Sequence, residues 1–194
     1  LKGSFFPALI VLLVLLWAFA KCLNAQLRVA GTLGFAMDDA WIHVAVARNF
    51  ATGNGWGVVP GKVLSVSTSP TWTLLLSVFF LFFSNPLKIT LFCSFACMAV
   101  ASVLCYLLAF RLTESRVLGI LASILLIMGP ISLWGLASGL ELPLSLAAMM
   151  LSLYLYYEAA PSSRVRTFAV PAAITLAAVS RPELFVLIPL ALID

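Results

Sequence analysis

Residues 89–110 read ITLFCSFACMAVASVLCYLLAF and contain no charged side chain. Further apolar runs occupy residues 5–20, 71–83, 117–134, 142–157, 167–179 and 184 onward. Lipid cannot satisfy backbone amides, so runs of this kind must bond internally as helices, and none shows the alternation of a barrel strand. The sequence therefore predicts an all-α fold, a polytopic bundle of transmembrane helices.

The overall composition places the chain among integral membrane proteins. Apolar residues make up 63% and charged residues 9%, against roughly 45–50% and 25% in soluble domains. The eleven basic residues are scattered along the chain, which argues against a nucleic-acid partner. Residues 5–20 predict a retained signal anchor, because Lys21 and Cys22 follow in place of a cleavage site.

We expect residues 1–194 to form one transmembrane module, the N-terminal part of a longer chain. The sequence begins without Met, and it stops at Asp194 while the apolar run from Leu184 is under way. The four cysteines all lie in apolar segments, where each is expected to act as a small buried hydrophobe.

The topology depends on whether residues 71–83 cross the bilayer. As a helix this segment rises only about 20 Å, against a hydrocarbon core of roughly 30 Å. If it dips in and returns, the basic loops face inward together, as positive-inside sorting favours. Those loops contain Lys2, Arg111, Arg116, Arg164 and Arg166. We therefore favour a segment that does not cross; if it crosses, the acidic turns are split between the two faces.

The long polar segment at residues 28–70 is predicted to be an outer loop with its own helix at about 38–52. Its apolar residues Ile42, Ala45, Val46 and Phe50 recur at helical spacing, which favours an amphipathic juxtamembrane helix.

Asp38 and Asp39 open this predicted helix. Acids at a membrane edge cost free energy, so they favour a functional site, although one of the two would suffice to cap the helix. The pair could instead hold a divalent cation, with Glu141 as a third ligand. His43 is four residues after Asp39 and on the same face, where it either pairs with Asp39 or lies as a surface residue.

Several short motifs follow one another in a recognisable order. They are Asp38-Asp39-Ala40-Trp41-Ile42, Ala47-Arg48-Asn49, Gly53-Asn54-Gly55, Ser67-Thr68-Ser69-Pro70-Thr71-Trp72-Thr73, Ser138-Gly139-Leu140-Glu141 and Ser180-Arg181-Pro182-Glu183. In this order the motifs resemble GT-C fold membrane glycosyltransferases, in particular the polyprenyl-phosphate-sugar-dependent branch with arabinofuranosyltransferases and protein mannosyltransferase-like enzymes. The resemblance spans most of the chain.

The resemblance implies transfer of a sugar from a polyprenyl-phosphate donor to an acceptor hydroxyl. It implies an outer active face of a bacterial-type plasma membrane, with Asp38 as the catalytic base and Asp39 beside it. Glu141 and Arg181 match a second acid and a phosphate-binding base.

Arg48 is a second candidate for the donor phosphate, because it lies on the loop helix, and His43 is a further substrate-binding candidate. Positive charge must meet a phosphate leaving group, and the planar guanidinium of an arginine binds phosphate in a bidentate manner. An interfacial anchor is the alternative role for Arg181.

An alternative function is a structural subunit of a larger membrane complex. In that case a transferase-like scaffold would pack against other membrane subunits, and its acids would contact only lipids or partner residues. Membrane lipids are expected partners in either case.

Overall fold

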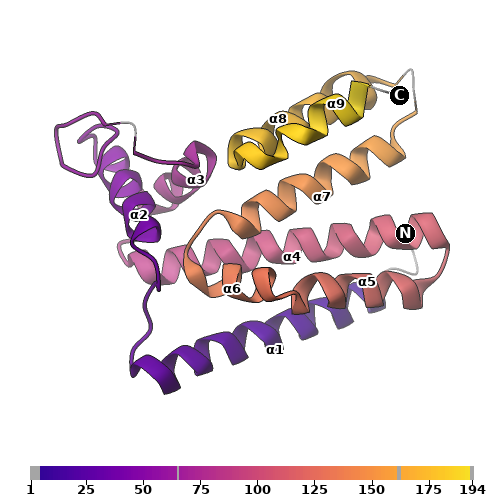
Figure 1. Ribbon diagram of the computed structural model, residues 1–194, viewed down its shortest axis with the longest axis horizontal. Coiled ribbons are helices and arrows are strands. Elements are labelled where there is room, and N and C mark those ends of the chain that lie inside the picture. Colours follow the sequence, from indigo (N-terminus) through magenta and orange to yellow (C-terminus); the bar gives the residue numbers. More distant parts are fainter. Residues whose placement is uncertain (1–4, 65, 161–162, 193–194) are drawn as a thin grey trace.

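Helices are the only regular secondary structure in the part of the chain that the computed structural model describes, residues 5–64, 66–160 and 163–192 (Figure 1). The elements are α1 (Phe5–Ala30), α2 (Asp38–Ala51), α3 (Pro70–Phe80), α4 (Pro86–Thr113), α5 (Arg116–Met128), α6 (Pro130–Ser138), α7 (Leu142–Glu158), the π-helical turn η1 (Val165–Ala169), α8 (Val170–Ser180), the 3₁₀ turn η2 (Pro182–Val186) and α9 (Leu187–Leu192). The all-α prediction is confirmed over these residues.

Two of the described helices are long and apolar enough to cross a bilayer, α1 and α4. Helices α5 and α6 would make a third span if they are counted as one, with a bend of 59° between them. These lengths agree with the membrane class that the composition predicts.

The break between α5 and α6 was not predicted from the sequence, where residues 117–134 read as one helix. Gly129 has an extended conformation, with φ −56° and ψ 135°, and Pro130 begins α6. A proline lacks an amide hydrogen and disfavours helical backbone at the preceding residue. The chain therefore bends at this dipeptide although its composition stays apolar.

Helix α1 extends ten residues further than the apolar run at residues 5–20 indicated. The additional turns include Gln26, whose side-chain amide donates a hydrogen bond of 3.2 Å to the carbonyl of Ala137 at the end of α6. They also include Lys21, which lies 5.7 Å from the centre of the Trp17 ring. A helix can thus extend beyond an apolar run where its polar side chains have hydrogen-bonding partners or reach the protein surface.

Helix α4 lies at the centre of the packing, between α5 and α7. One buried apolar cluster joins α1, α4, α5, α6 and α7 around Leu15, Met98, Tyr106 and Ile127. A second joins α2 and α3 to the first turns of α4 around Trp72 and Leu76. A third joins α8 and α9 to α7 around Ala148 and Ala177.

The helix predicted at residues 38–52 begins at Asp38 and ends at Ala51. Neither aspartate is its N-cap, however: Met37 occupies that position, and no side chain caps the helix. Asp38 and Asp39 both lie in its first turn, where carboxylates favour the positive end of the helix dipole. The capping role considered for one of the pair is therefore wrong.

Polar segments from distant parts of the chain meet at one end of α4. Helices α2 and α3 lie there, at the left of Figure 1, together with the turn that enters α7. The opposite end of α4 has the ion pair between Arg111 and Glu158, with 2.7 Å between Nε and Oε1.

The turn between α6 and α7 depends on Gly139. Its φ is +80°, a left-handed conformation that costs an L-residue with a side chain about 1–2 kcal/mol. A Cβ at this position would also lie 2.6 Å from a ring carbon of Phe35. Both the backbone conformation and the neighbouring ring therefore require glycine here.

We predict that Gly139→Ala lowers the free energy of unfolding by about 2–5 kcal/mol, the sum of the left-handed backbone cost and the overpacking cost. Gly61→Ala is the matched control, because Gly61 has φ +78° and no atom within 4 Å of an added Cβ. Thermal unfolding of the two purified variants measures the difference. Equal losses would show that Phe35 does not confine the turn.

Candidate functional site

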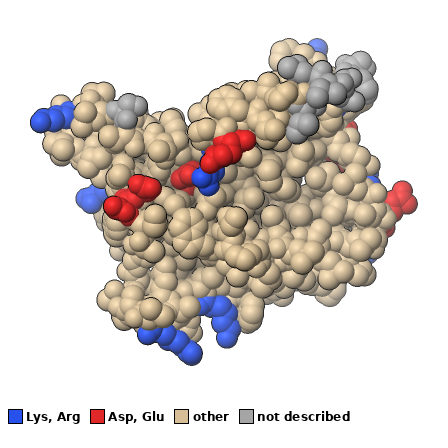
Figure 2. Space-filling model, in the orientation of Figure 1, with Lys and Arg blue, Asp and Glu red and all other residues tan. Residues whose placement is uncertain are grey.

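A cluster of polar side chains lies where α2, α3, the α6–α7 turn and the end of α8 meet. Its central residues are His43, Glu141 and Arg181, from three segments that are far apart in the sequence. On the face drawn in Figure 2, uncharged residues dominate, and acidic and basic side chains touch one another near the middle. Oppositely charged side chains are thus in contact on this face.

His43 is the most buried member of the cluster, with 1% of its surface exposed. Its Nδ1 lies 3.0 Å from the Thr73 hydroxyl and 3.2 Å from the Ser67 hydroxyl. These two hydroxyls are themselves 2.8 Å apart. The interpretation of His43 as a surface residue is therefore wrong: α2 turns it inward, against the loop that leads into α3.

The other ring nitrogen of His43, Nε2, lies 3.6 Å from Oε2 of Glu141. A carboxylate can only accept, whereas a hydroxyl can donate or accept. Nε2 also lies 3.5 Å from the Thr68 hydroxyl. This arrangement favours the tautomer with hydrogen on Nε2, which faces Glu141 and Thr68, while Nδ1 accepts from Ser67 or Thr73. Burial lowers the pKa of His43 below its ordinary value, and the nearby charges of Glu141 and Asp39 oppose that shift without reversing it.

Glu141 is 7% exposed and immediately precedes α7. Its Oε1 lies 3.7 Å from Nε of Arg181. Its Oε2 makes no hydrogen bond within the described part of the chain, since the separation from His43 exceeds hydrogen-bonding distance. Glu141 therefore has an ionic partner and one oxygen that could still accept a hydrogen bond.

Arg181 connects this buried acid to the surface. Its guanidinium also donates to both carboxylate oxygens of Glu183, at 3.3 and 3.2 Å. The Glu183 side chain is 67% exposed, and that of Glu141 is 10% exposed. A hydrogen bond from its own backbone amide, together with the charge of Arg181, lowers the pKa of Glu183.

Two further hydrogen bonds attach α3 to the same corner of the molecule. The Trp72 indole nitrogen donates to the carbonyl of Gly139 at 3.1 Å. The Thr71 hydroxyl donates to the Ser180 hydroxyl at 3.1 Å. Helix α3 is thereby tied to the residues just before Glu141 and just before Arg181.

Asp38 and Asp39 are exposed in the first turn of α2, one turn before His43. The negative charge of Asp39 favours the protonated form of His43 and so opposes the lowering of its pKa by burial. Neither aspartate makes a hydrogen bond or ion pair with another residue in the described ranges. The structure therefore places the doublet beside the cluster as two available carboxylates.

Arg48 does not join the cluster. It lies in the last turn of α2, and its side chain lines a separate cavity of about 340 Å³ with Thr52 and residues 80–84.

The described residues were also compared with the donor groups that a metal ion requires. In residues 5–64, 66–160 and 163–192, no group of three or more His, Cys, Asp and Glu side chains is placed to hold a metal. The cation site considered for Asp38, Asp39 and Glu141 therefore stays a prediction, and no step below depends on a metal.

The sequence indicated the charged members of the cluster but not the hydroxyls that hold His43. Ser67 and Thr73 lie in a stretch rich in hydroxyl side chains, residues 67–73. The signal available in the sequence was the occurrence of this stretch in a chain with a single histidine. These hydroxyls are 24 and 30 residues away from His43 in the sequence. Contacts over such separations produce no periodic pattern in the sequence, so they are visible only in the folded chain.

No protein family, no curated protein and no solved structure matches this chain in comparisons with known proteins.

We predict that stability falls as the pH is lowered from about 7.5 to 5, and that His43→Gln reduces this dependence. The folded pKa is below the unfolded value, so the unfolded chain binds the proton more readily. The contribution of His43 is complete above its unfolded pKa and is lost as the pH falls toward its folded pKa, with a slope of at most about 1.4 kcal/mol per pH unit.

His43 is the single histidine of the chain, so one imidazole NMR signal follows its titration directly. A midpoint at or above the value of a free histidine would contradict the prediction.

A double-mutant cycle tests which acid Arg181 stabilises. We predict a coupling of about 1–3 kcal/mol between Arg181→Met and Glu141→Gln, because removing the cation leaves a buried carboxylate unpaired. The matched pair, Arg181→Met with Glu183→Gln, should couple by about 0.2–1 kcal/mol, as exposed ion pairs do. Unfolding of the single and double variants provides both values, and the reverse order would contradict a structural role for the buried contact.

Proposed function

We propose that the protein is a GT-C type membrane glycosyltransferase that moves a sugar from a polyprenyl-phosphate donor to an acceptor hydroxyl. The main support is the convergence of three motifs in space. The helix that Asp38 opens, the turn at Glu141 and the turn at Arg181 are joined through the contacts of His43 and Arg181 with Glu141. These are the motifs in which the sequence resembles such enzymes.

In this proposal the helices form a transmembrane bundle, with α2 as a juxtamembrane helix at the outer face of a bacterial-type plasma membrane. The two long apolar helices α1 and α4 support the bundle. The orientation rests on the short turn between α4 and α5, which Arg111 and Arg116 flank, because basic residues in short loops favour the inner side of a membrane.

Asp38 is the proposed general base. The acceptor oxygen attacks the anomeric carbon and forms the new glycosidic bond, while its proton passes to the Asp38 carboxylate. The bond between the anomeric carbon and the phosphate oxygen breaks, and its electron pair leaves with the phosphate. Asp38 suits this role because it is exposed and makes no hydrogen bond or ion pair with another described residue.

Arg181 is the proposed partner of the donor phosphate. Its contact with Glu183 is bidentate and exposed, and a phosphate could take the place of this carboxylate. Glu141 would hold the guanidinium from the buried side during that exchange. His43 is a positioning residue here, since both of its ring nitrogens face protein groups.

A structural subunit is the second candidate function. It is favoured by the number of contacts that the polar residues make with one another, because Trp72 and Thr71 already bond to the two turns. In that case the cluster would fasten α2 and α3 to the bundle, and Asp38 would be dispensable.

Sugar transfer from a radiolabelled polyprenyl-phosphate sugar, measured in membranes containing the protein, separates these two functions. We predict that Asp38→Asn lowers the rate about 10²- to 10⁴-fold, the usual contribution of general base catalysis. Glu114→Gln is the control, because Glu114 is also exposed but follows α4 at the opposite end.

Equal thermal unfolding of both variants would exclude misfolding as the cause. Full activity of Asp38→Asn would contradict the assignment of the base. Absence of transfer by the unmodified protein with every donor would favour the structural subunit.

A further inference from the structure

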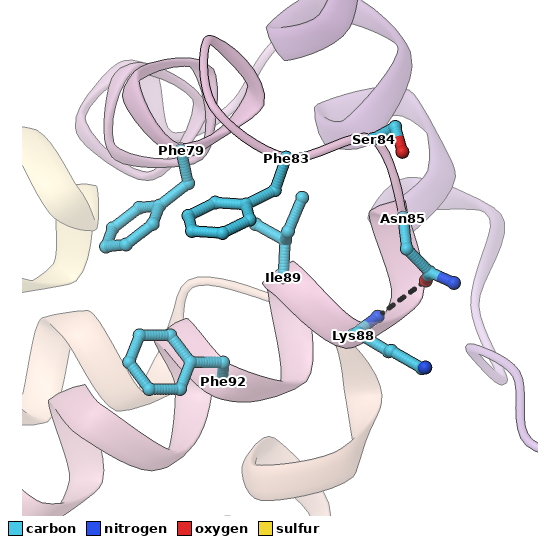
Figure 3. Close-up of a pocket in the computed structure, with 7 residues that line it drawn as sticks. All are labelled: Phe79, Phe83, Ser84, Asn85, Lys88, Ile89 and Phe92. Atoms are coloured by element: carbon cyan, nitrogen blue, oxygen red, sulfur yellow. Dashed lines mark hydrogen bonds between the residues drawn. The ribbon is translucent and has the colours of Figure 1, made fainter.

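A cavity of about 490 Å³ lies between the end of α3 and the start of α4, away from the cluster at His43. Phe79, Phe83, Ile89 and Phe92 form its apolar wall, and Ser84, Asn85 and Lys88 form the rest of its lining. In Figure 3 the rings gather on one side, and the polar ends of Ser84, Asn85 and Lys88 lie on the other. The cavity therefore has an apolar and a polar part.

The apolar part continues along α4. A second cavity of about 320 Å³ shares Phe79 and Phe92 with the first, and extends to Val100 and Leu151 between α3, α4, α7 and α8. From Lys88 to Val100, helix α4 rises about 18 Å. The two cavities together, named here the α4 groove, match about half of a hydrocarbon core of roughly 30 Å, the depth of one leaflet.

The polar end of the groove is positively charged and has no internal counter-ion. Lys88 is exposed and forms no ion pair with any residue in the described ranges, and no acidic side chain lines either cavity. Arg48 lines a neighbouring cavity that also contains Phe83 and Ser84. Lys88 is thus the cation that lines the polar end of the groove, with Arg48 in the neighbouring cavity, and this charge complements a negative group.

The position of the groove along α4 fits the edge of a bilayer. Helix α4 is one of the candidate spans, and the polar end of the groove lies at its first turn. Phe82 and Phe83, which precede this turn, are 75% and 60% exposed. Exposed aromatic residues beside a cation are characteristic of the headgroup level of membrane proteins.

We propose that the α4 groove binds one anionic membrane lipid, with its phosphate at Lys88 and an acyl chain between Phe79, Phe83 and Phe92. The charge at one end and the apolar length behind it correspond to the two parts of such a lipid. An extended peptide would bring backbone polar groups into an apolar wall that offers them no partner, and an apolar partner helix would leave Lys88 without an anion. The groove shares no residue with the cluster at Glu141, and the lipid proposed here is not a substrate of the proposed sugar transfer.

Lipid retention by the purified protein tests the site. The detergent-solubilised protein is delipidated, incubated with phosphatidylglycerol or phosphatidylcholine, and analysed by native mass spectrometry. We predict that one phosphatidylglycerol is retained in preference to phosphatidylcholine, and that Lys88→Ala lowers the affinity for it about fivefold, the contribution of one lysine near anionic lipid.

Arg28→Ala is the matched control for charge. Arg28 is an exposed cation in the last turn of α1, the other candidate span, and it does not line the groove. It should therefore leave the preference for phosphatidylglycerol unchanged. An equal effect of the two substitutions, or equal retention of both lipids by the unmodified protein, would overturn the proposal in favour of nonspecific annular lipid.

A second variant tests the apolar part. Ala96 lines the groove, so Ala96→Phe should fill it and reduce retention of phosphatidylglycerol. Leu125→Phe, at a position on α5 that is 74% exposed, should not. Thermal unfolding checks that each variant folds. Undiminished retention by folded Ala96→Phe would show that the chain lies elsewhere. None of these measurements involves a sugar donor, so failure here is distinguishable from failure of the proposed transferase activity.

Discussion

The Glu141 carboxylate, buried beside Arg181 and His43, is the constraint on which this end of the molecule depends. An unpaired charge in such a place costs several kcal/mol, so the fold must bring a cation to it. Arg181 can reach Glu141 only when α8 ends beside the turn that enters α7. The position of α8 against α7 is thus fixed by apolar packing along the helices and by one ionic contact at their ends.

The same acid influences how α2 packs. Nε2 of His43 faces Glu141 and the Thr68 hydroxyl, and Nδ1 faces the hydroxyls of Ser67 and Thr73. Its ring therefore connects α2 to the α6–α7 turn and to the segment that leads into α3. Because burial lowers the pKa of His43, the ring is neutral at physiological pH and can serve as a donor at one nitrogen and an acceptor at the other. A charged ring would have to donate at both, and the hydroxyls would then have to accept.

The helices were predictable from the sequence because membrane-type apolar runs leave few other states for the backbone. Helix α2 was found from its spacing, within one residue of its observed end at Ala51. The break at Gly129-Pro130 was missed because hydropathy stays high across it, and backbone geometry, not composition, ends the helix there. Glu141 and Arg181 stood out as rare charges, whereas the hydroxyl partners of His43 did not, because their contacts are set by tertiary packing.

Helix α3 explains how a segment too short to span a bilayer on its own can organise both polar and apolar sites. Its first turn supplies Thr71, Trp72 and Thr73 to the cluster, and Phe79 in its last turn lines the α4 groove. Eleven residues rise about 17 Å, so the two sites cannot move independently while α3 remains intact. A change at Trp72 should therefore disturb the far wall of the groove as well, through the helix and not through any direct contact between the sites.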